Sequence, residues 1–144
     1  MTRIDSTTIQ AELVRAGLLH ATARLTDATY APPRLDWLLG KFDHWFRESL
    51  NALRIAPYVA EAGDCDDYAA LYVALAKVCH RRMPSCAGTA LPVGFLHYVS
   101  ATGPHAVVVA ITSDAGLVVI EPQLPRKTLT LTPAEAKSAW LLVI

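Results

Sequence analysis

The sequence predicts an α+β fold in which helices come first along the chain and an antiparallel sheet follows. Apolar residues in the first half recur at helical spacing, whereas those after residue 87 form continuous runs, typical of strands buried on both faces. The length of 144 residues suits one domain, and 53% apolar residues exclude a disordered chain. We expect a helical part over residues 1–56, a core over residues 57–125, and a last strand and helix over residues 126–144.

Two helices are expected in the helical part. The first covers about residues 6–25, where one apolar stripe repeats at helical spacing, with N-cap residues at Ser6 to Thr8. A connector at residues 27–34 contains Pro32-Pro33, which cannot continue that helix. The second helix runs to about residue 53, and its expected buried side chains are Leu35, Leu38, Phe42, Trp45, Phe46 and Leu50.

A third helix is expected to begin at Cys65 and to end before Pro84. Asp64 is a favourable N-cap, and Asp67 three residues later approximates a capping box. The inward stripe of this helix passes through Tyr68, Leu71 and Leu75. Cys65 therefore stands at the helix start and outside that stripe, which argues against a simple core cysteine.

Three strands are expected at residues 90–100, 105–112 and 117–121, with a turn at Ser113–Gly116 between the last two. An edge strand at residues 128–131 comes next. The final helix has a clear start, because Thr132 can cap it and proline occupies its first position.

Cys65, His105 and Glu121 are the candidate catalytic residues. A helix N-terminus favours negative charge, so a cysteine there ionises more readily. The neighbouring aspartates, Asp64 and Asp66 among them, oppose this effect, so a base is needed, and His105 at the start of a strand can supply it. Glu121, which closes the next strand, would orient the imidazole.

The strand pattern makes one geometric demand on this site. Side chains alternate between the two faces of a sheet, and positions 105 and 121 share a face only if the turn between their strands holds an odd number of residues or a bulge shifts the register. A five-residue turn at Thr112–Gly116 would place Glu121 opposite Val107, diagonal to His105 and within side-chain reach.

Three short motifs resemble the transglutaminase-like superfamily of cysteine enzymes, including bacterial transglutaminase-like cysteine proteinases and small phage and bacterial members. They are Asp64-Cys65-Asp66-Asp67-Tyr68-Ala69, Gly103-Pro104-His105-Ala106-Val107 and Val119-Ile120-Glu121-Pro122-Gln123. The resemblance implies a papain/transglutaminase-like core with the cysteine at a helix N-terminus. It also implies that Cys65 is the nucleophile, His105 the base and Glu121 the acid, with glutamate where the family usually has aspartate.

The expected function is that of a cysteine enzyme that acts on an amide carbonyl through a Cys-His-Glu triad. Peptide hydrolysis, deamidation and acyl transfer share one acyl-enzyme and stay open as alternatives, and the substrate would be a protein or a peptide. The other hypothesis is a catalytically inactive transglutaminase-like binding or assembly module, for which the resemblance to small phage members allows a phage origin.

No cofactor is expected. The resemblance makes Asp64 and Asp66 weak calcium candidates, since some of its proteinases bind calcium through acids beside the cysteine. Thirteen basic and thirteen acidic residues give no basic patch for nucleic acid, and no apolar stretch reaches the roughly 20 residues of a membrane span. The first residues do not resemble a secretory signal, so we expect a cytoplasmic protein, in the host cytoplasm if phage-encoded.

Overall fold

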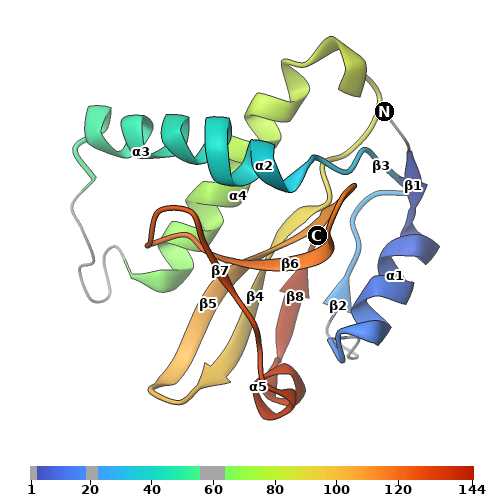
Figure 1. Ribbon diagram of the computed structural model, residues 1–144, viewed down its shortest axis with the longest axis vertical. Coiled ribbons are helices and arrows are strands. Elements are labelled where there is room, and N and C mark those ends of the chain that lie inside the picture. Colours follow the sequence, from blue (N-terminus) through green and yellow to red (C-terminus); the bar gives the residue numbers. More distant parts are fainter. Residues whose placement is uncertain (1–2, 19–22, 56–63) are drawn as a thin grey trace.

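A six-stranded sheet with helices on both faces forms the centre of the computed structural model, which describes residues 3–18, 23–55 and 64–144 (Figure 1). The helices are α1 (Ser6–Arg15), α2 (Leu35–Trp37), α3 (Asp43–Ala52), α4 (Cys65–Arg81) and α5 (Pro133–Ser138). The strands are β1 (Ile4–Asp5), β2 (Ala23–Arg24), β3 (Thr29–Tyr30), β4 (Val93–Ser100), β5 (Gly103–Thr112), β6 (Gly116–Glu121), β7 (Lys127–Leu129) and β8 (Leu141–Val143). The large sheet has the order β2-β8-β4-β5-β6-β7, and β1 pairs with β3 separately.

Helix α1 is shorter than expected. It ends at Arg15 because Gly17, with φ of +69°, closes it: the Gly17 N–H donates to the carbonyl of Val14, and the Leu18 N–H to that of Leu13. These two bonds form a Schellman motif, which satisfies the last carbonyls of the helix. The expected continuation to residue 25 is therefore wrong where the structure describes it, and residues 19–22 lie outside the described residues.

The second expected helix is confirmed in its extent. It consists of α2, a π-helical segment at Leu38–Phe42 and α3, which follow one another without a break. Phe42 and Phe46 pack edge-on against Tyr72 of α4, with ring centroids 4.8 and 5.0 Å apart. This aromatic cluster holds α3 against α4, and α4 lies across β4 and β5 (Figure 1).

Strand β5 is buried on both faces, as its unbroken apolar run predicts. Ala106, Val108 and Ala110 belong to the core on the α4 side, and Val107, Val109 and Ile111 belong to the core on the side of α1 and α5. A strand with this environment has no polar face to present to water, which explains the sequence Ala106-Val-Val-Val-Ala-Ile.

The sheet is not purely antiparallel, contrary to the prediction. Strand β8 pairs antiparallel with β4 and parallel with β2, so both ends of the chain add short strands to one edge. Gly94 permits this pairing, because a Cβ at that position would lie 1.7 Å from the backbone oxygen of Val143. The sequence gives little sign of β2 and β8, since strands of two and three residues are too short for a periodic pattern.

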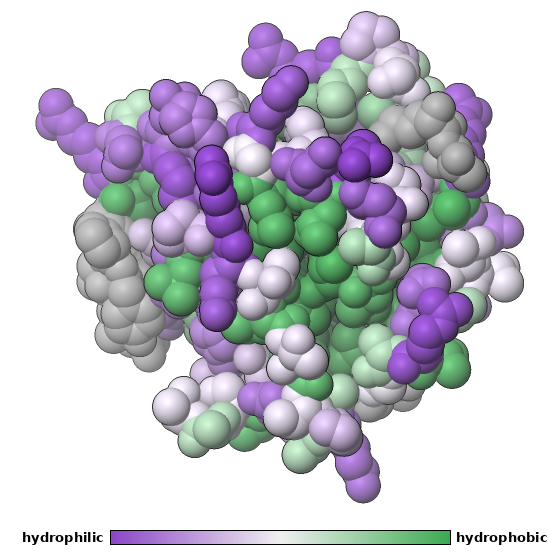
Figure 2. Space-filling model, viewed as in Figure 1, coloured by the Kyte–Doolittle hydropathy of each residue, from purple (hydrophilic) through white to green (hydrophobic). Residues whose placement is uncertain are grey.

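Apolar side chains gather at the centre of the face shown in Figure 2, where β6 crosses the view of Figure 1. A groove of about 380 Å³ lies between the end of α1 and strands β6 and β7, and its larger lining side chains are Leu18, Leu35, Leu117, Val119, Leu129 and Leu131. Among the described residues, no helix is long and apolar enough to span a membrane.

Candidate functional site

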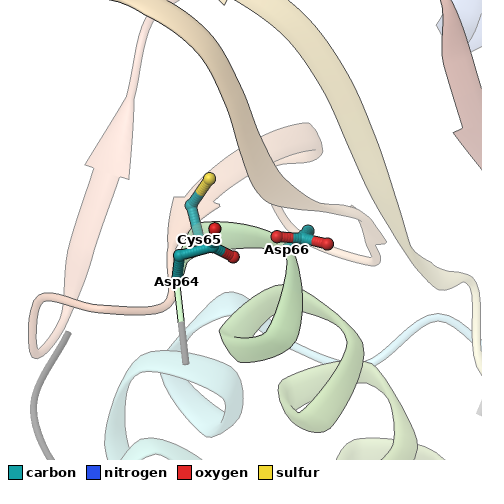
Figure 3. A group of neighbouring side chains, drawn as sticks. All are labelled: Asp64, Cys65 and Asp66. Atoms are coloured by element: carbon teal, nitrogen blue, oxygen red, sulfur yellow. The ribbon is translucent and has the colours of Figure 1, made fainter. Parts of the chain in front are cut away.

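The first turn of α4 presents Cys65 to the sheet. Asp64 occupies the N-cap position with extended backbone (φ −98°, ψ −158°), but its carboxylate makes no capping hydrogen bond, so the capping role expected of it is wrong. Figure 3 shows the Cys65 sulfur pointing away from the helix turn and toward the strands. The thiol therefore faces the sheet rather than the interior of the helix layer.

The Cys65 thiol lies against the backbone of β5. Its Sγ accepts a hydrogen bond from the N–H of Ala106 at 3.3 Å, and Ala106 directly follows His105. The last residues that pair between β5 and β6 are Val108 and Ile120. The Ala106 N–H lies beyond this pair, where β6 no longer pairs with β5. A backbone N–H directed at sulfur favours the thiolate over the thiol.

His105 and Glu121 meet as the strand pattern requires. Residues 112 and 116 pair across the β5–β6 turn, which leaves three residues between them. The same register, extended by one residue beyond the pair of Val108 and Ile120, places Glu121 opposite Val107. His105 Nε2 lies 2.8 Å from Glu121 Oε2, with the two side chains 22% and 9% exposed. The odd turn length thus brings the two predicted residues together on one face of the sheet.

Further contacts fix this pair. The other oxygen of Glu121 accepts from the Gln123 N–H at 3.1 Å, which holds the carboxylate from the β6–β7 turn. The Tyr98 ring packs edge-on against the His105 ring at 5.8 Å, whereas His97 packs against Trp140. Of these two neighbours on β4, Tyr98 is therefore the one that contacts His105.

The hydrogen bond also determines which imidazole nitrogen carries the proton. An ionised carboxylate only accepts, so Glu121 requires the hydrogen on Nε2 of His105. Nδ1 of a neutral ring is then an acceptor, available to take a proton. This is the tautomer that a general base needs.

Burial raises the pKa of the Cys65 thiol, the Ala106 N–H lowers it, and the charges of Asp64 and Asp66 raise it again; the net effect is a pKa above the usual thiol range. The helix N-terminus therefore does not ionise Cys65 at neutral pH without help. Any thiolate chemistry at this position needs a base to receive the proton.

The residues Asp64, Cys65 and Asp66 offer ligand atoms that lie within 4.8 Å of one another. Calcium prefers six to eight oxygen ligands, and this group supplies two carboxylates beside a sulfur atom. The calcium expectation at Asp64 and Asp66 stays a prediction.

A pocket of about 590 Å³ adjoins this cluster, between α3, the first turns of α4 and the β6–β7 turn. Tyr68, one turn after Cys65, and Gln123, two residues after Glu121, belong to its wall. Leu50, Ile55 and Leu124 make it largely apolar, and Arg47 adds a guanidinium whose Nε is buried without a hydrogen-bond partner among the described residues. Sequence patterns did not single out Arg47, because its position on α3 is that of an ordinary polar-face residue.

No family model and no curated protein matches this chain. Solved structures do match. One is titled "PSL1a-E64 complex", with a TM-score of 0.76 and 19% identity over 99% of this chain and 51% of that chain. Another is Polyporus squamosus lectin bound to the human-type influenza-binding epitope Neu5Acα2-6Galβ1-4GlcNAc, with a TM-score of 0.76 and 18% identity over 99% of this chain and 49% of that chain. The chain thus spans about half the length of these structures and shares their fold.

These neighbours correct the resemblance on which the functional interpretation rested. One of them is a structure of Polyporus squamosus lectin, and neither is described as a transglutaminase-like protein. The assignment to the transglutaminase-like superfamily and the papain/transglutaminase-like core are therefore wrong. The cysteine enzyme acting on an amide carbonyl is wrong too, and so is the transglutaminase-like scaffold of its alternative, the inactive binding or assembly module. The physical reason is that motifs of five or six residues describe a helix start and two strand ends, and such local features recur in different folds.

Proposed function

We propose that this chain is a ligand-binding domain whose site comprises Cys65, His105, Glu121 and the adjoining pocket of Arg47, Tyr68 and Gln123. The ligand is a peptide segment or a small molecule of similar build, and the Cys65 thiol is reactive toward it. Binding and thiol reactivity are the whole of the proposal, which includes no turnover of the ligand. The observations that carry it are the 2.8 Å contact between His105 and Glu121 and the hydrogen bond that the Cys65 sulfur accepts from the N–H of Ala106, the residue after His105.

The proposed reactivity follows from the proton positions. Glu121 keeps the hydrogen on Nε2, so Nδ1 receives the proton that leaves Cys65. The sulfur electron pair then attacks an electrophilic carbon of the ligand: the S–C bond forms as the bond from that carbon to its leaving group breaks, and the leaving group departs with that electron pair, as iodide does from iodoacetamide. The Ala106 N–H stabilises the thiolate that precedes this step. Without the imidazole, the raised pKa of Cys65 keeps the thiol neutral and slow to react.

The pocket supports a ligand with an apolar group and a hydrogen-bond acceptor. Leu50, Ile55 and Leu124 supply apolar surface, and the Arg47 guanidinium supplies donors beside it. Both structural neighbours are complexes, one with E64 and the other with the trisaccharide Neu5Acα2-6Galβ1-4GlcNAc. E64 and this trisaccharide are therefore the two probes to compare at this site.

Thiol labelling tests the proposal. The native protein is treated with iodoacetamide at pH 7, and mass spectrometry measures the rate at each cysteine. Cys65 is expected to react faster than Cys79, which is also partly exposed and whose pKa is likewise raised by burial. His105→Ala should reduce the Cys65 rate to that of Cys79, whereas His44→Ala, at an exposed histidine on α3, should leave it unchanged.

Ligand protection completes the test. E64 is expected to protect Cys65 from labelling, and Arg47→Gln should weaken this protection. Equal labelling of Cys65 and Cys79 in the native protein would refute the reactive thiol. Protection by the trisaccharide and not by E64 would refute the proposed ligand class and favour a glycan.

A further inference from the structure

A second cavity lies away from the cysteine site, at the other end of α4. It has a volume of about 770 Å³, within the range of small-molecule sites. Its walls are the last two turns of α4, the loop of residues 86–91, and residues 27–29 beside β3. The Ala31 N–H donates to the Ala90 carbonyl, and the Ala90 N–H donates to the Thr29 carbonyl. These two backbone hydrogen bonds connect the last two walls to each other.

The α4 wall is positively charged. Lys77 and Arg81 are one helical turn apart and both line the cavity. Neither forms an ion pair with a described carboxylate. Cations near a helix C-terminus are favourable by themselves, but two of them on a concave wall also create a positive potential that a bound anion can use.

The same cavity carries a buried polar atom that lacks a partner. His80 is 2% exposed, its burial lowers its pKa, and its Nε2 has no hydrogen-bond partner among the described residues. Buried polar atoms without partners are costly in a folded protein, and they are expected where a ligand or ordered water completes the bonding.

Asp27 limits where an anion can bind. Its carboxylate lines the far wall and accepts from the Thr26 hydroxyl at 2.9 Å. A negative group is therefore repelled from that wall and attracted to the α4 wall.

We propose that this cavity is a second binding site, for a small molecule whose oxyanion, a phosphate or a carboxylate, binds at Lys77 and Arg81. Hydroxyl or amino groups of the same molecule face Asp27. This site shares no residue with the site of Cys65, His105 and Glu121, so a negative result at one site does not affect the proposal for the other.

Inorganic phosphate is the first probe, measured by the melting temperature of the full chain against sodium chloride of equal ionic strength, with sodium acetate as the carboxylate arm. Phosphate at tens of millimolar is expected to raise the melting temperature of the native protein. In Lys77→Gln/Arg81→Gln this increase should disappear, because both charged contacts are gone. Arg82→Gln/Lys41→Gln is the matched control: it also removes two positive charges, from residues that do not line the cavity, and should keep the increase.

Each outcome decides the proposal. A larger shift with phosphate than with acetate would identify a phosphate-bearing ligand, and the reverse a carboxylate-bearing one. No shift with either anion would overturn the proposal. An equal loss in the Arg82→Gln/Lys41→Gln variant would overturn it as well, since it would show that net charge alone, and not this cavity, attracts the anion.

Discussion

Glu121→Gln is the substitution that examines the His105–Glu121 pair most closely. Glutamine has nearly the same volume as glutamate. Its amide oxygen can still accept from the Gln123 N–H, which in the native protein lies 3.1 Å from the Glu121 carboxylate. Its NH₂ group then faces Nε2 of His105. Since an NH₂ group only donates, the histidine is expected to move its hydrogen from Nε2 to Nδ1.

The expected loss of stability follows from the bond that is replaced. Hydrogen bonds to a charged group contribute about 1.5–3 kcal/mol, a neutral one about 1 kcal/mol, so the difference is about 0.5–2 kcal/mol. The Glu121 side chain is only 9% exposed, so solvent screening reduces this difference little. For a chain of 144 residues this corresponds to a decrease of roughly 2–6 °C in melting temperature.

Two measurements follow this substitution. Nitrogen-15 NMR of the histidine ring should show Nε2 protonated in the native protein and Nδ1 protonated in the variant, and iodoacetamide labelling of Cys65 should slow down. Glu48→Gln, at an exposed carboxylate that pairs with His44 at 3.4 Å, should change neither. If Glu121→Gln retained both the native tautomer and the native labelling rate, the role given to this carboxylate would be incorrect.

Two other predictions address the sheet and the thiol. Gly94→Ala places a Cβ 1.7 Å from the Val143 oxygen and should lower the free energy of unfolding by about 3 kcal/mol or more, measured by urea unfolding. Gly40→Ala, with no atom within 4 Å of its Cβ and a helical position, should instead raise it by about 1 kcal/mol; equal effects would contradict the close approach of β8. In the His105→Ala background, Asp66→Asn removes a charge that raises the pKa of Cys65, so the double variant should hold more thiolate at pH 8 and label faster than His105→Ala alone, with a smaller gain at high salt. A slower rate would show that Asp66 acts otherwise.

The central strands could be predicted from sequence because burial on both faces requires an unbroken run of apolar residues. The run from Ala106 to Ile111 has no polar alternation, and the structure buries it on both faces. The spacing of positions 105 and 121 predicted an odd turn, and the register of β5 with β6 has one. Because side chains alternate between the two faces of a strand, the residue spacing was enough to predict this side-chain contact.

Strands β2 and β8 and the end of α1 escaped prediction for a common reason. Gly17 ends α1 through a backbone conformation, while the apolar stripe continues beyond it. Strand β8 depends on the missing side chain of Gly94, a pairing between positions far apart in the chain. Local patterns contain neither fact, because both depend on what another segment of the backbone does.

At the candidate site, side-chain chemistry was visible in the sequence but backbone chemistry was not. The motif around Cys65 indicated a thiol at a helix start, and the structure has α4 begin there. The Ala106 N–H that bonds to Sγ has no signal, since every residue except proline carries one. The family assignment failed because it extended these local features to a whole fold.

The pH dependence of Cys65 labelling tests the central claim most directly. If the imidazole of His105 accepts the thiol proton, the labelling rate of the native protein should already be high at pH 7 and change little up to pH 9. In His105→Ala the rate should be low at pH 7 and increase steeply with pH, as expected for a thiol whose pKa is raised by burial. Native and variant proteins with the same steep profile would contradict the account.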